Sequence, residues 1–396
     1  MQELNVALIG HGFMGRAHSH AWRNAAVFFD VPFKPVLKVV CGTRPQALEA
    51  FARRWGWEEV ETDWRRVVQR EDIQIADITT PPWLHRDIVI EAARHGKHIF
   101  CEKPMAMNAA EAQEMYEAAE AAGVVHYLNH NYRKYPAVAL AKRLIEQGKV
   151  GQVYHWRSAY FNSRWIDPQS PMTWHLRREK AGSGVIGGFH SHTVDLARYL
   201  IGEIQSVCAL TRTFIPQRPS PDGTSLEAVT VEDACSFLAE FENGAMGSFE
   251  ASTLTPGRRN YNSFEIYGSG GSLAFNQERA NELKFFSLDD PEHARGFRTI
   301  LVTERIHPSM HAGWPPGHHI GYEHSFYHAV VEFLTAIHQG QPASPNFYDG
   351  LKGMQVLDAV LRSAETGQKV PVGEPREDAV VERSVKRLKR MVDGLV

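Results

Sequence analysis

The chain has 396 residues, of which 43% are hydrophobic and 22% are charged. This length exceeds what one ordinary hydrophobic core serves, so we expect two domains. The formal net charge of −3 does not favour nucleic acid or a membrane surface as partner, and no apolar run approaches the roughly 18 residues of a membrane span. The N-terminus lacks the features of a signal peptide, and the four cysteines are scattered without a Cys-x-x-Cys pair, so we expect a reduced, cytoplasmic protein without a metal site.

The first 130 residues alternate short apolar runs with helical stretches. The predicted strands cover residues 6–9, 36–40, 75–78, 98–101 and 124–128. The predicted helices between them cover residues 44–54, 85–94 and 109–122. Short apolar strands separated by helices are typical of a parallel sheet with crossover helices, so residues 1–130 are predicted to form an α/β domain.

After Gly151 the strand-like runs follow one another without helices between them. They cover residues 153–161, 204–215, 231–241, 245–252, 263–267, 273–275, 283–287 and 299–302. Turn signals such as Asn243-Gly244 separate these runs, which indicates a large, mainly antiparallel sheet. One helix, over 184–200, interrupts it.

Two further helices, over 322–338 and 349–366, are expected to pack back on the first domain. We therefore predict an α+β domain over residues 131–372 and a C-terminal helical tail over residues 373–396.

A glycine-rich loop follows the first predicted strand and leads into a helical run. It reads Gly10-His11-Gly12-Phe13-Met14-Gly15. In such a loop the first glycine makes the tight turn, the second lets the backbone approach a pyrophosphate, and the third lets helix and strand pack closely. The alternative is a glycine-rich turn without a ligand, but the position at the first strand-to-helix turn favours binding of NAD or NADP at the helix N-terminus.

The residues after the second strand leave the choice between NAD and NADP open. A site that prefers NAD usually carries an acid at this position, whereas this chain reads Cys41-Gly42-Thr43-Arg44. Thr43 and Arg44 could hold a 2′-phosphate. Arg44 could equally be a solvated residue in the first turn of the next helix.

The fourth strand closes with Cys101-Glu102-Lys103-Pro104. In a parallel sheet the carboxyl ends of the strands form the ligand crevice. A lysine there could polarise a substrate hydroxyl, although most lysines simply lie on the surface.

Together these motifs resemble the Gfo/Idh/MocA family, and the likeness runs through nearly the whole chain. Further segments that carry it are Thr79-Thr80-Pro81, His85, Asn131-Tyr132-Arg133, Ala181-Gly182-Ser183-Gly184 and His192-Thr193-Val194-Asp195-Leu196. The late run from Trp314 to His324 resembles the subgroup of levoglucosan and glucoside 3-dehydrogenases.

The resemblance implies a Rossmann dinucleotide-binding domain, an α+β domain with a large open sheet, and homodimers or homotetramers built on that sheet. It also implies hydride transfer between C4 of a nicotinamide and a sugar-like alcohol, with Lys103 assisting at the hydroxyl and His192 moving the proton. The positions that it assigns to the cofactor are Gly10, Gly12, Phe13, Met14, Gly15, Thr43, Arg44, Thr80, Pro81, His85, Glu102, Lys103 and Asn131.

One position departs from the family pattern. Many members carry an aspartate four residues before the catalytic histidine, where this chain has Gly188. His190 could substitute for it, because a second imidazole can relay protons near neutral pH. Alternatively the chemistry has drifted. Asp195 could orient a neighbouring group, but such an aspartate more often forms a structural pair.

A sugar site needs an aromatic wall and a set of hydrogen-bonding partners. The candidate substrate residues are Tyr132, Asn162, Arg164, Trp165, Trp174, His175, His192, His319 and Tyr322. Core packing and solvated surface are the plain alternatives for the tryptophans and for Arg164. Because an arginine fork binds carboxylate or sulfonate, an anionic sugar is one hypothesis.

The leading functional hypothesis is an NAD(P)-dependent oxidoreductase acting on a ring hydroxyl of a pyranose sugar or glycoside, with C3 as the candidate carbon. The second is an NAD-dependent glycosidase, which oxidises the sugar transiently, eliminates the aglycone, adds water and reduces again; a sulfonated glycoside such as a sulfoquinovoside would suit it. The third is a non-catalytic dinucleotide sensor, against which the presence of both Lys103 and His192 argues.

Overall fold

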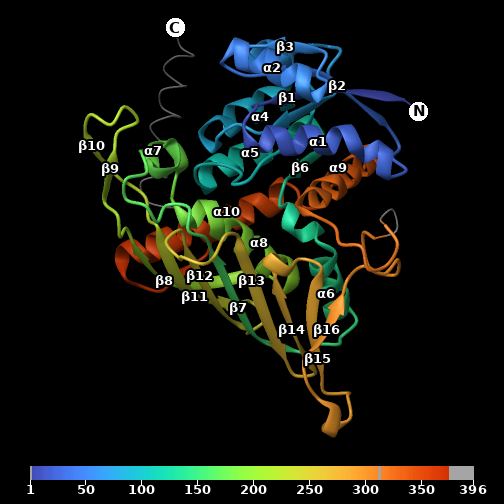
Figure 1. Cartoon of the computed structure of the whole chain (residues 1–396), viewed down its shortest axis with the longest axis vertical. Helices are drawn as coiled ribbons and strands as arrows, with labels where there is room; N and C mark the ends of the chain where they lie inside the picture. Colours follow the sequence, from blue (N-terminus) through green and yellow to red (C-terminus); the bar gives the residue numbers. More distant parts are fainter. Residues whose placement is uncertain (1, 311–313, 374–396) are drawn as a thin grey trace.

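The computed structural model describes residues 2–310 and 314–373. The helical tail predicted over 373–396 therefore lies outside the described residues, apart from Gly373. Figure 1 shows a parallel α/β part at one end of the long axis and a broad sheet at the other, with helices between them.

The first part is built on a six-stranded sheet with the strand order β3-β2-β1-β4-β5-β6. All of its strand pairs are parallel. The strands are β1 (Glu3–Ile9), β2 (Lys34–Cys41), β3 (Glu59–Glu61), β4 (Ile75–Ile78), β5 (His98–Cys101) and β6 (His126–Leu128). This is the order of a dinucleotide-binding Rossmann fold, so the predicted fold of this part is confirmed.

Helices cover this sheet because the chain must cross over between parallel strands. They are α1 (Phe13–Phe28), α2 (Pro45–Trp55), α3 (Trp64–Gln69), α4 (His85–Arg94) and α5 (Ala109–Ala122). The crossovers bring the ends of β1, β4 and β5 to one edge of the sheet, where the glycine loop and Lys103 follow.

The second part is built on a nine-stranded sheet with the order β16-β15-β14-β13-β7-β12-β11-β8-β17. Its strands are β7 (Val153–Phe161), β8 (Ile204–Arg212), β11 (Ala234–Phe241), β12 (Met246–Ser252), β13 (Tyr261–Gly268), β14 (Gly271–Asn276), β15 (Glu282–Ser287), β16 (Arg298–Leu301) and β17 (Val370–Pro371). Only the pair β7–β12 is parallel among the described strands of this sheet, which confirms the mainly antiparallel prediction.

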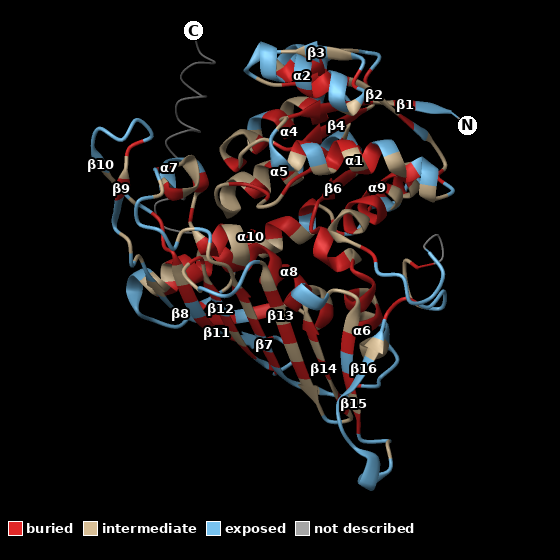
Figure 2. Ribbon diagram, viewed as in Figure 1, coloured by how far each residue is buried: buried red, intermediate tan, exposed pale blue. Residues whose placement is uncertain are grey.

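One face of this sheet is covered by helices and the other is open. Its strands are contacted by α6 (Pro136–Glu146), α8 (Ser191–Leu200) and α10 (Phe347–Thr366). Helix α9 (Tyr322–Gln339) instead contacts α1, and the short helix α7 (Arg178–Ala181) contacts the turn at Pro82–Leu84. Burial alternates along β11, where Phe237 is buried and Leu238 is exposed, as expected when one face packs and the other does not. Figure 2 shows further exposed residues along the hairpin of β9 (Gln217–Pro219) and β10 (Leu226–Ala228) and between β15 and β16.

The two parts are joined by the late helices. Phe326 and Phe333 of α9 lie in one hydrophobic cluster with Trp22 and Phe100 of the first part, and α10 packs against α5 and β6. The expectation that these helices return to the first domain is therefore correct. None of the helices in the described part of the chain is long and apolar enough to cross a membrane.

Candidate active site

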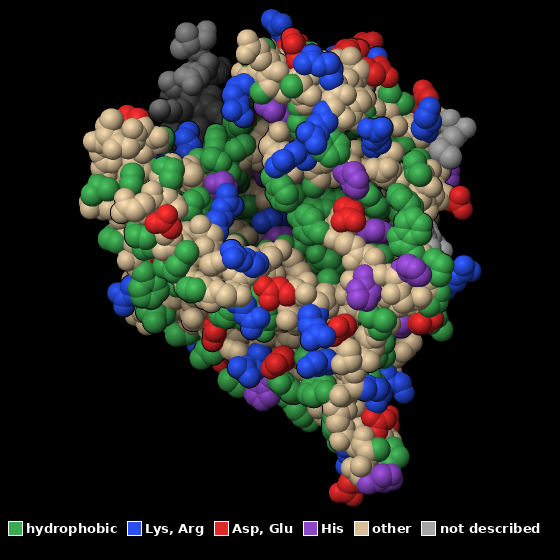
Figure 3. All heavy atoms as spheres, in the orientation of Figure 1, with side chains coloured by type: hydrophobic (Ala, Val, Ile, Leu, Met, Phe, Trp, Pro, Cys, Tyr) green, Lys and Arg blue, Asp and Glu red, His purple; other side chains and the backbone are tan. Residues whose placement is uncertain are grey.

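A cleft of about 1470 Å³ lies between the two parts, at the carboxyl ends of the first sheet's strands. Figure 3 shows a hollow on this face of the molecule with Lys, Arg and His side chains at its edge and within it. Typical small-molecule pockets measure about 300–1,000 Å³. The cleft is therefore large enough for a dinucleotide together with a second ligand.

The glycine loop at the cleft has the geometry that pyrophosphate binding requires. Gly10 has a φ of +113°, and a Cβ there would lie 2.7 Å from Oγ1 of Thr79. A Cβ on Gly15 would lie 2.5 Å from the main-chain oxygen of Gly10, so α1 can pack this closely only without a side chain. Gly12 lines the cleft, and a Cβ there meets no described atom within 4 Å. The N-terminus of α1 thus faces an open cradle that fits an anion.

The other predicted cofactor positions divide into those that line the cleft and those behind it. Lining residues include Phe13, Met14, Thr43, Arg44, Thr80, Pro81, Glu102, Lys103 and Asn131. His85 does not line the cleft, which corrects its assignment as a direct cofactor contact. Its ring nitrogens lie 2.7 Å from the carbonyl oxygen of Thr80 and 3.1 Å from that of Pro104, so it links the loops that follow β4 and β5.

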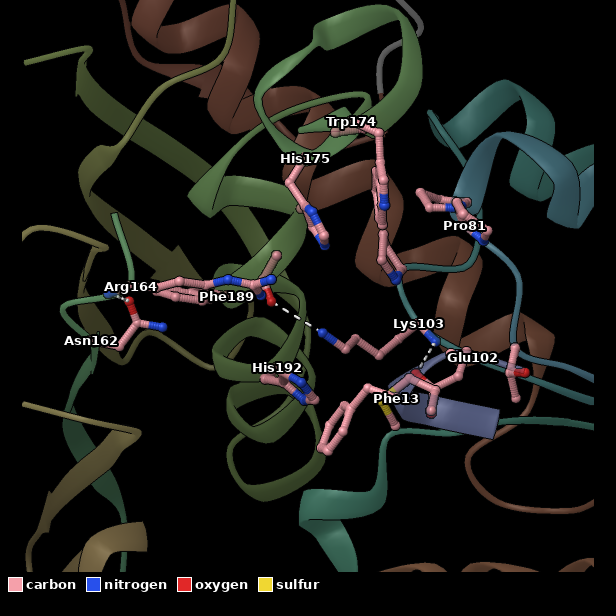
Figure 4. Close-up of a pocket in the computed structure, with 18 of the residues that line it drawn as sticks. Phe13, Pro81, Glu102, Lys103, Asn162, Arg164, Trp174, His175, Phe189 and His192 are labelled. Carbon is pink, nitrogen blue, oxygen red and sulfur yellow. Dashed lines mark hydrogen bonds between the residues drawn. The ribbon is translucent and has the colours of Figure 1, made fainter. Parts of the chain in front are cut away.

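Lys103 extends from the end of β5 across the cleft toward the second domain (Figure 4). Its Nζ donates to the main-chain oxygen of Gly188 at 3.1 Å. Burial lowers the pKa of Lys103, and the charge of Glu102 partly offsets this effect. At the position where the family pattern has an aspartate, this chain therefore offers the lysine a carbonyl oxygen.

His192 lies at the start of α8 and also lines the cleft. Its ring stacks on Tyr132 with 4.1 Å between the centroids, and the hydroxyls of Tyr132 and Tyr160 are 3.0 Å apart. Burial, followed by the charges of Lys103 and His130, lowers the pKa of His192 well below its usual range. Its Nδ1 is buried and makes no hydrogen bond to any described residue. The lowered pKa favours the neutral imidazole, which can accept a proton at one ring nitrogen.

His190 lies elsewhere, and the idea that it replaces the missing carboxylate is corrected. Its ring packs edge-on against Phe237 at 4.9 Å, and its nitrogens lie 3.0 Å from Oγ1 of Thr193 and 3.4 Å from the carbonyl oxygen of Cys235. Residues two apart on a helix face different sides. Because His192 faces the cleft, His190 is directed into the core of the second domain.

Asp195 pairs with Arg133, which is the structural role that was the alternative for this aspartate. Its carboxylate accepts hydrogen bonds from Nε of Arg133 at 2.8 Å and from a terminal nitrogen of the same guanidinium at 2.5 Å. Both side chains are 3% exposed, and Asp349 adds a further contact at 3.2 Å. The pair holds the turn that carries Tyr132 against α8, and so keeps Tyr132 beside His192.

The substrate side of the cleft has aromatic and cationic walls. Trp174 stacks on His175 with 3.7 Å between ring centroids, and the guanidinium of Arg164 lies 4.9 Å from the ring centroid of Trp165. Burial, followed by the charges of Arg164 and Lys103, lowers the pKa of His175 to about 4. The charges of Arg164 and Lys103 therefore both act at His175, and Figure 4 shows Trp174, His175 and Lys103 around one space.

Of the remaining predicted substrate residues, Asn162 and Tyr322 line the cleft. His319 is exposed and does not line it, so its assignment is corrected. Phe189, which was not predicted, lines the cleft and stacks on Tyr160 with 4.3 Å between ring centroids. Its spacing of three residues from His192 on one helical segment was the available signal. Trp83, after Pro81 and Pro82, was also missed and lies edge-on to Trp174.

Comparison with known proteins agrees with this geometry. Residues 4–130 match the model of an oxidoreductase family with an NAD-binding Rossmann fold, and residues 138–274 match the GFO/IDH/MocA C-terminal domain. Levoglucosan dehydrogenase of Pseudarthrobacter phenanthrenivorans is 41% identical over 378 residues, which cover 92% of this chain and 97% of the relative. The 2,7-anhydro-N-acetylneuraminate hydratase of Mediterraneibacter gnavus is 33% identical over 94% of this chain and 98% of the relative.

Among solved structures, levoglucosan dehydrogenase in complex with NADH and levoglucosan superposes with a TM-score of 0.92 at 41% identity, covering 94% of this chain and 100% of that one. The strand order of the parallel sheet and the glycine cradle are those expected of an NAD-binding Rossmann fold. The chain belongs to the Gfo/Idh/MocA family of oxidoreductases and carries its NAD-binding Rossmann fold.

Proposed function

We propose that this protein oxidises a ring hydroxyl of a pyranose sugar or glycoside, at C3 as the first candidate carbon, with NAD or NADP as acceptor. The observation that carries the proposal is the meeting of Lys103 and His192, from different domains, in the cleft beside the glycine cradle. The likeness to levoglucosan dehydrogenase over almost the whole chain supports a sugar as substrate.

The two side chains divide the work at the hydroxyl. A bound nicotinamide supplies the hydride acceptor. Lys103 places a positive charge where the hydroxyl oxygen becomes alkoxide-like, which is the usual use of such a group in a water-poor site. His192, being neutral, accepts the proton at a ring nitrogen. The Gly188 carbonyl orients the lysine amino group between the two domains.

We further propose that the sugar carries an anionic substituent. The guanidinium of Arg164 has no ion pair within the described part of the chain and lies on the substrate side of the cleft. Since the charges of Arg164 and Lys103 both reach His175, a carboxylate or sulfonate there would meet two cations. The hydrogen-bonding groups nearby, such as Asn162, also serve a neutral sugar.

The alternative is an NAD-dependent glycosidase whose net reaction is hydrolysis. Two observations support the glycosidase alternative. The first is that Gly188 stands where many family members have an aspartate. The second is that a relative of 33% identity is named a 2,7-anhydro-N-acetylneuraminate hydratase, and a hydratase adds water without net redox change. In that reaction Lys103 and His192 would still act at the oxidised hydroxyl, and a base would also remove a proton from the adjacent ring carbon.

One experiment separates the two reactions. The purified protein is incubated with levoglucosan, a nitrophenyl glucoside, a nitrophenyl glucuronide or a sulfoquinovoside, each with NAD or NADP. Absorbance of reduced nicotinamide and release of aglycone are followed together. Net reduction without release supports the dehydrogenase, whereas release without net reduction supports the glycosidase. Inactivity toward every sugar with either cofactor, or unchanged activity of Lys103→Ala, would overturn the proposal.

We further propose a homodimer or homotetramer built on the open face of the nine-stranded sheet, in a cytoplasmic enzyme. Leu210, Leu238 and Met246 are more than half exposed there, at 67%, 57% and 55%. Light scattering should therefore give a dimer or tetramer for the wild type and a smaller species for Leu238→Lys. A monomeric wild type would refute this assembly.

A further inference from the structure

Beneath the lysine lies a row of buried polar side chains that the chemistry above does not use. His18, on α1, has Nδ1 2.8 Å from Oδ1 of Asp77 and Nε2 3.0 Å from Oε1 of Glu102. Trp22 donates from Nε1 to Oδ2 of Asp77 at 2.6 Å, and Asn129 donates from Nδ2 to Oε1 of Glu102 at 2.7 Å. The row spans α1, β4 and the ends of β5 and β6.

Each ring nitrogen of His18 faces a carboxylate, and Nδ2 of Asn129 also lies 3.1 Å from Nε2. An ionised carboxylate can only accept hydrogen bonds, and an imidazole donates from both nitrogens only when it is protonated. Burial by itself would lower the pKa of His18, but the charges and hydrogen bonds of Asp77 and Glu102 outweigh burial and raise that pKa to about 10. The side chains of His18, Asp77 and Glu102 are 1%, 0% and 5% exposed, so the imidazole is enclosed between two buried carboxyl groups.

Glu102 connects His18 to the reacting centre. Its Oε1 is held by His18 and Asn129, while its Oε2 accepts the main-chain amide of Lys103 at 3.1 Å. The amide of Glu102 itself donates to the carbonyl oxygen of Ile78 at 2.9 Å, as part of the sheet. The carboxylate thus holds the main chain at Lys103, two residues after β5, where the Lys103 side chain extends toward Gly188.

We propose that His18 is a positioning residue for the reaction: it holds the Glu102 carboxylate, which holds the main chain of Lys103. His18 does not line the cleft, so its effect on turnover passes through Glu102. Because His18 lies on the helix that begins at the glycine cradle, one hydrogen-bonded unit joins that helix to the lysine. Only the turnover part of the test below rests on the proposed function.

The test compares His18→Gln with Trp22→Phe as a matched control. The control removes a buried hydrogen bond of similar length from Asp77 and leaves Glu102 untouched. The assay uses levoglucosan and NAD, and turnover is divided by the number of protein molecules that bind NADH. His18→Gln should lower kcat by about tenfold to a hundredfold, because misplacing a reacting group by about 1 Å can cost about a hundredfold in rate. KM for the sugar and the affinity for NADH should change little, and Trp22→Phe should keep the wild-type kcat.

A double-variant cycle tests the route. If His18 acts through Glu102, then His18→Gln combined with Glu102→Gln should lose no more kcat than the stronger single variant. Additive losses, equal losses in His18→Gln and Trp22→Phe, or wild-type kcat in His18→Gln would each overturn the proposal.

Hydrogen exchange supplies a reading without turnover. In His18→Gln the Lys103 amide should exchange faster than in the wild type, whereas the Glu102 amide, held by Ile78, should stay protected as an internal reference. Wild-type protection of Lys103 would overturn the proposal. If the wild type were inactive on every sugar, the proposed function would be refuted. Hydrogen exchange at the Lys103 amide would then still test the positioning role of His18. If His18→Gln fails to fold, Asp77→Asn replaces it, because this variant keeps the His18 ring and removes the carboxylate beside Nδ1. Asp77→Asn should then accelerate exchange of the Lys103 amide. Unchanged exchange of that amide would overturn the proposal.

Discussion

Gly12→Val is expected to abolish dinucleotide binding while the chain stays folded. Gly12 has a φ of −77°, which any residue adopts, and a Cβ there meets no described atom within 4 Å. The side chain would instead enter the space where a pyrophosphate approaches the backbone. A hydrogen bond to a charged group is worth about 1.5–3 kcal/mol. Losing two such amide-to-phosphate bonds costs about 3–6 kcal/mol, or about 10²–10⁴ in affinity.

The assay is calorimetric titration with NADH beside thermal unfolding, with Gly15→Ala as the contrasting variant. A Cβ on Gly15 would lie 2.5 Å from the main-chain oxygen of Gly10. Backbone cannot easily move aside, so Gly15→Ala should lower the free energy of unfolding by about 1–3 kcal/mol. Undiminished NADH binding by Gly12→Val would refute the assignment of this loop, and unfolding of Gly12→Val would refute the argument from open space.

Lys103→Ala and His192→Ala should each lower kcat by about 10²–10⁴, the usual worth of a positioned acid or base, while titration shows nearly unchanged NADH affinity. Asp195→Asn should lower the free energy of unfolding by about 3 kcal/mol in denaturant titrations, the low end for breaking a buried ion pair, because Asp349 still faces the Arg133 guanidinium. NADP should bind with an affinity at least comparable to that of NAD, because no acid follows β2 and Arg44 lines the cleft. Arg44→Ala should lower the affinity for NADP. A much higher affinity of the wild type for NAD would contradict this prediction.

The parallel domain was predictable because its strands are short apolar runs with clear ends. The helices predicted over 85–94 and 109–122 have those bounds in the structure. The edge strand β3 was missed because two of its three residues are glutamates and it pairs only with β2. Helix α6 was missed although Pro136 at its first position is a helix-start signal.

Site residues could be predicted where their side-chain chemistry and a family motif pointed to a role. Roles that depend on contacts between distant parts of the chain could not be predicted. The role of Asp195 depended on Arg133, 62 residues earlier, a pairing that spacing alone does not predict. That only one of His190 and His192 faces the cleft follows from helix geometry, but which one does is decided by packing against Phe237. The contact of Lys103 with a main-chain oxygen has no side-chain signature in the sequence.

Gly188 offers a way to move the proton chemistry in a defined direction. A Cβ there meets no described atom within 4 Å, so Gly188→Asp can place a carboxylate one turn before His192 and beside Lys103, whose Nζ lies 3.1 Å from the Gly188 oxygen. A nearby negative charge raises the pKa of both groups. His192 must be neutral to accept the proton, so the acidic limb of the kcat profile should move to higher pH. Lys103 must be charged, so the alkaline limb should move the same way. Gly188→Asn, of equal size without the charge, should leave both limbs at their wild-type positions. Coinciding profiles for the two variants would show that His192 and Lys103 are not the groups whose titration controls turnover.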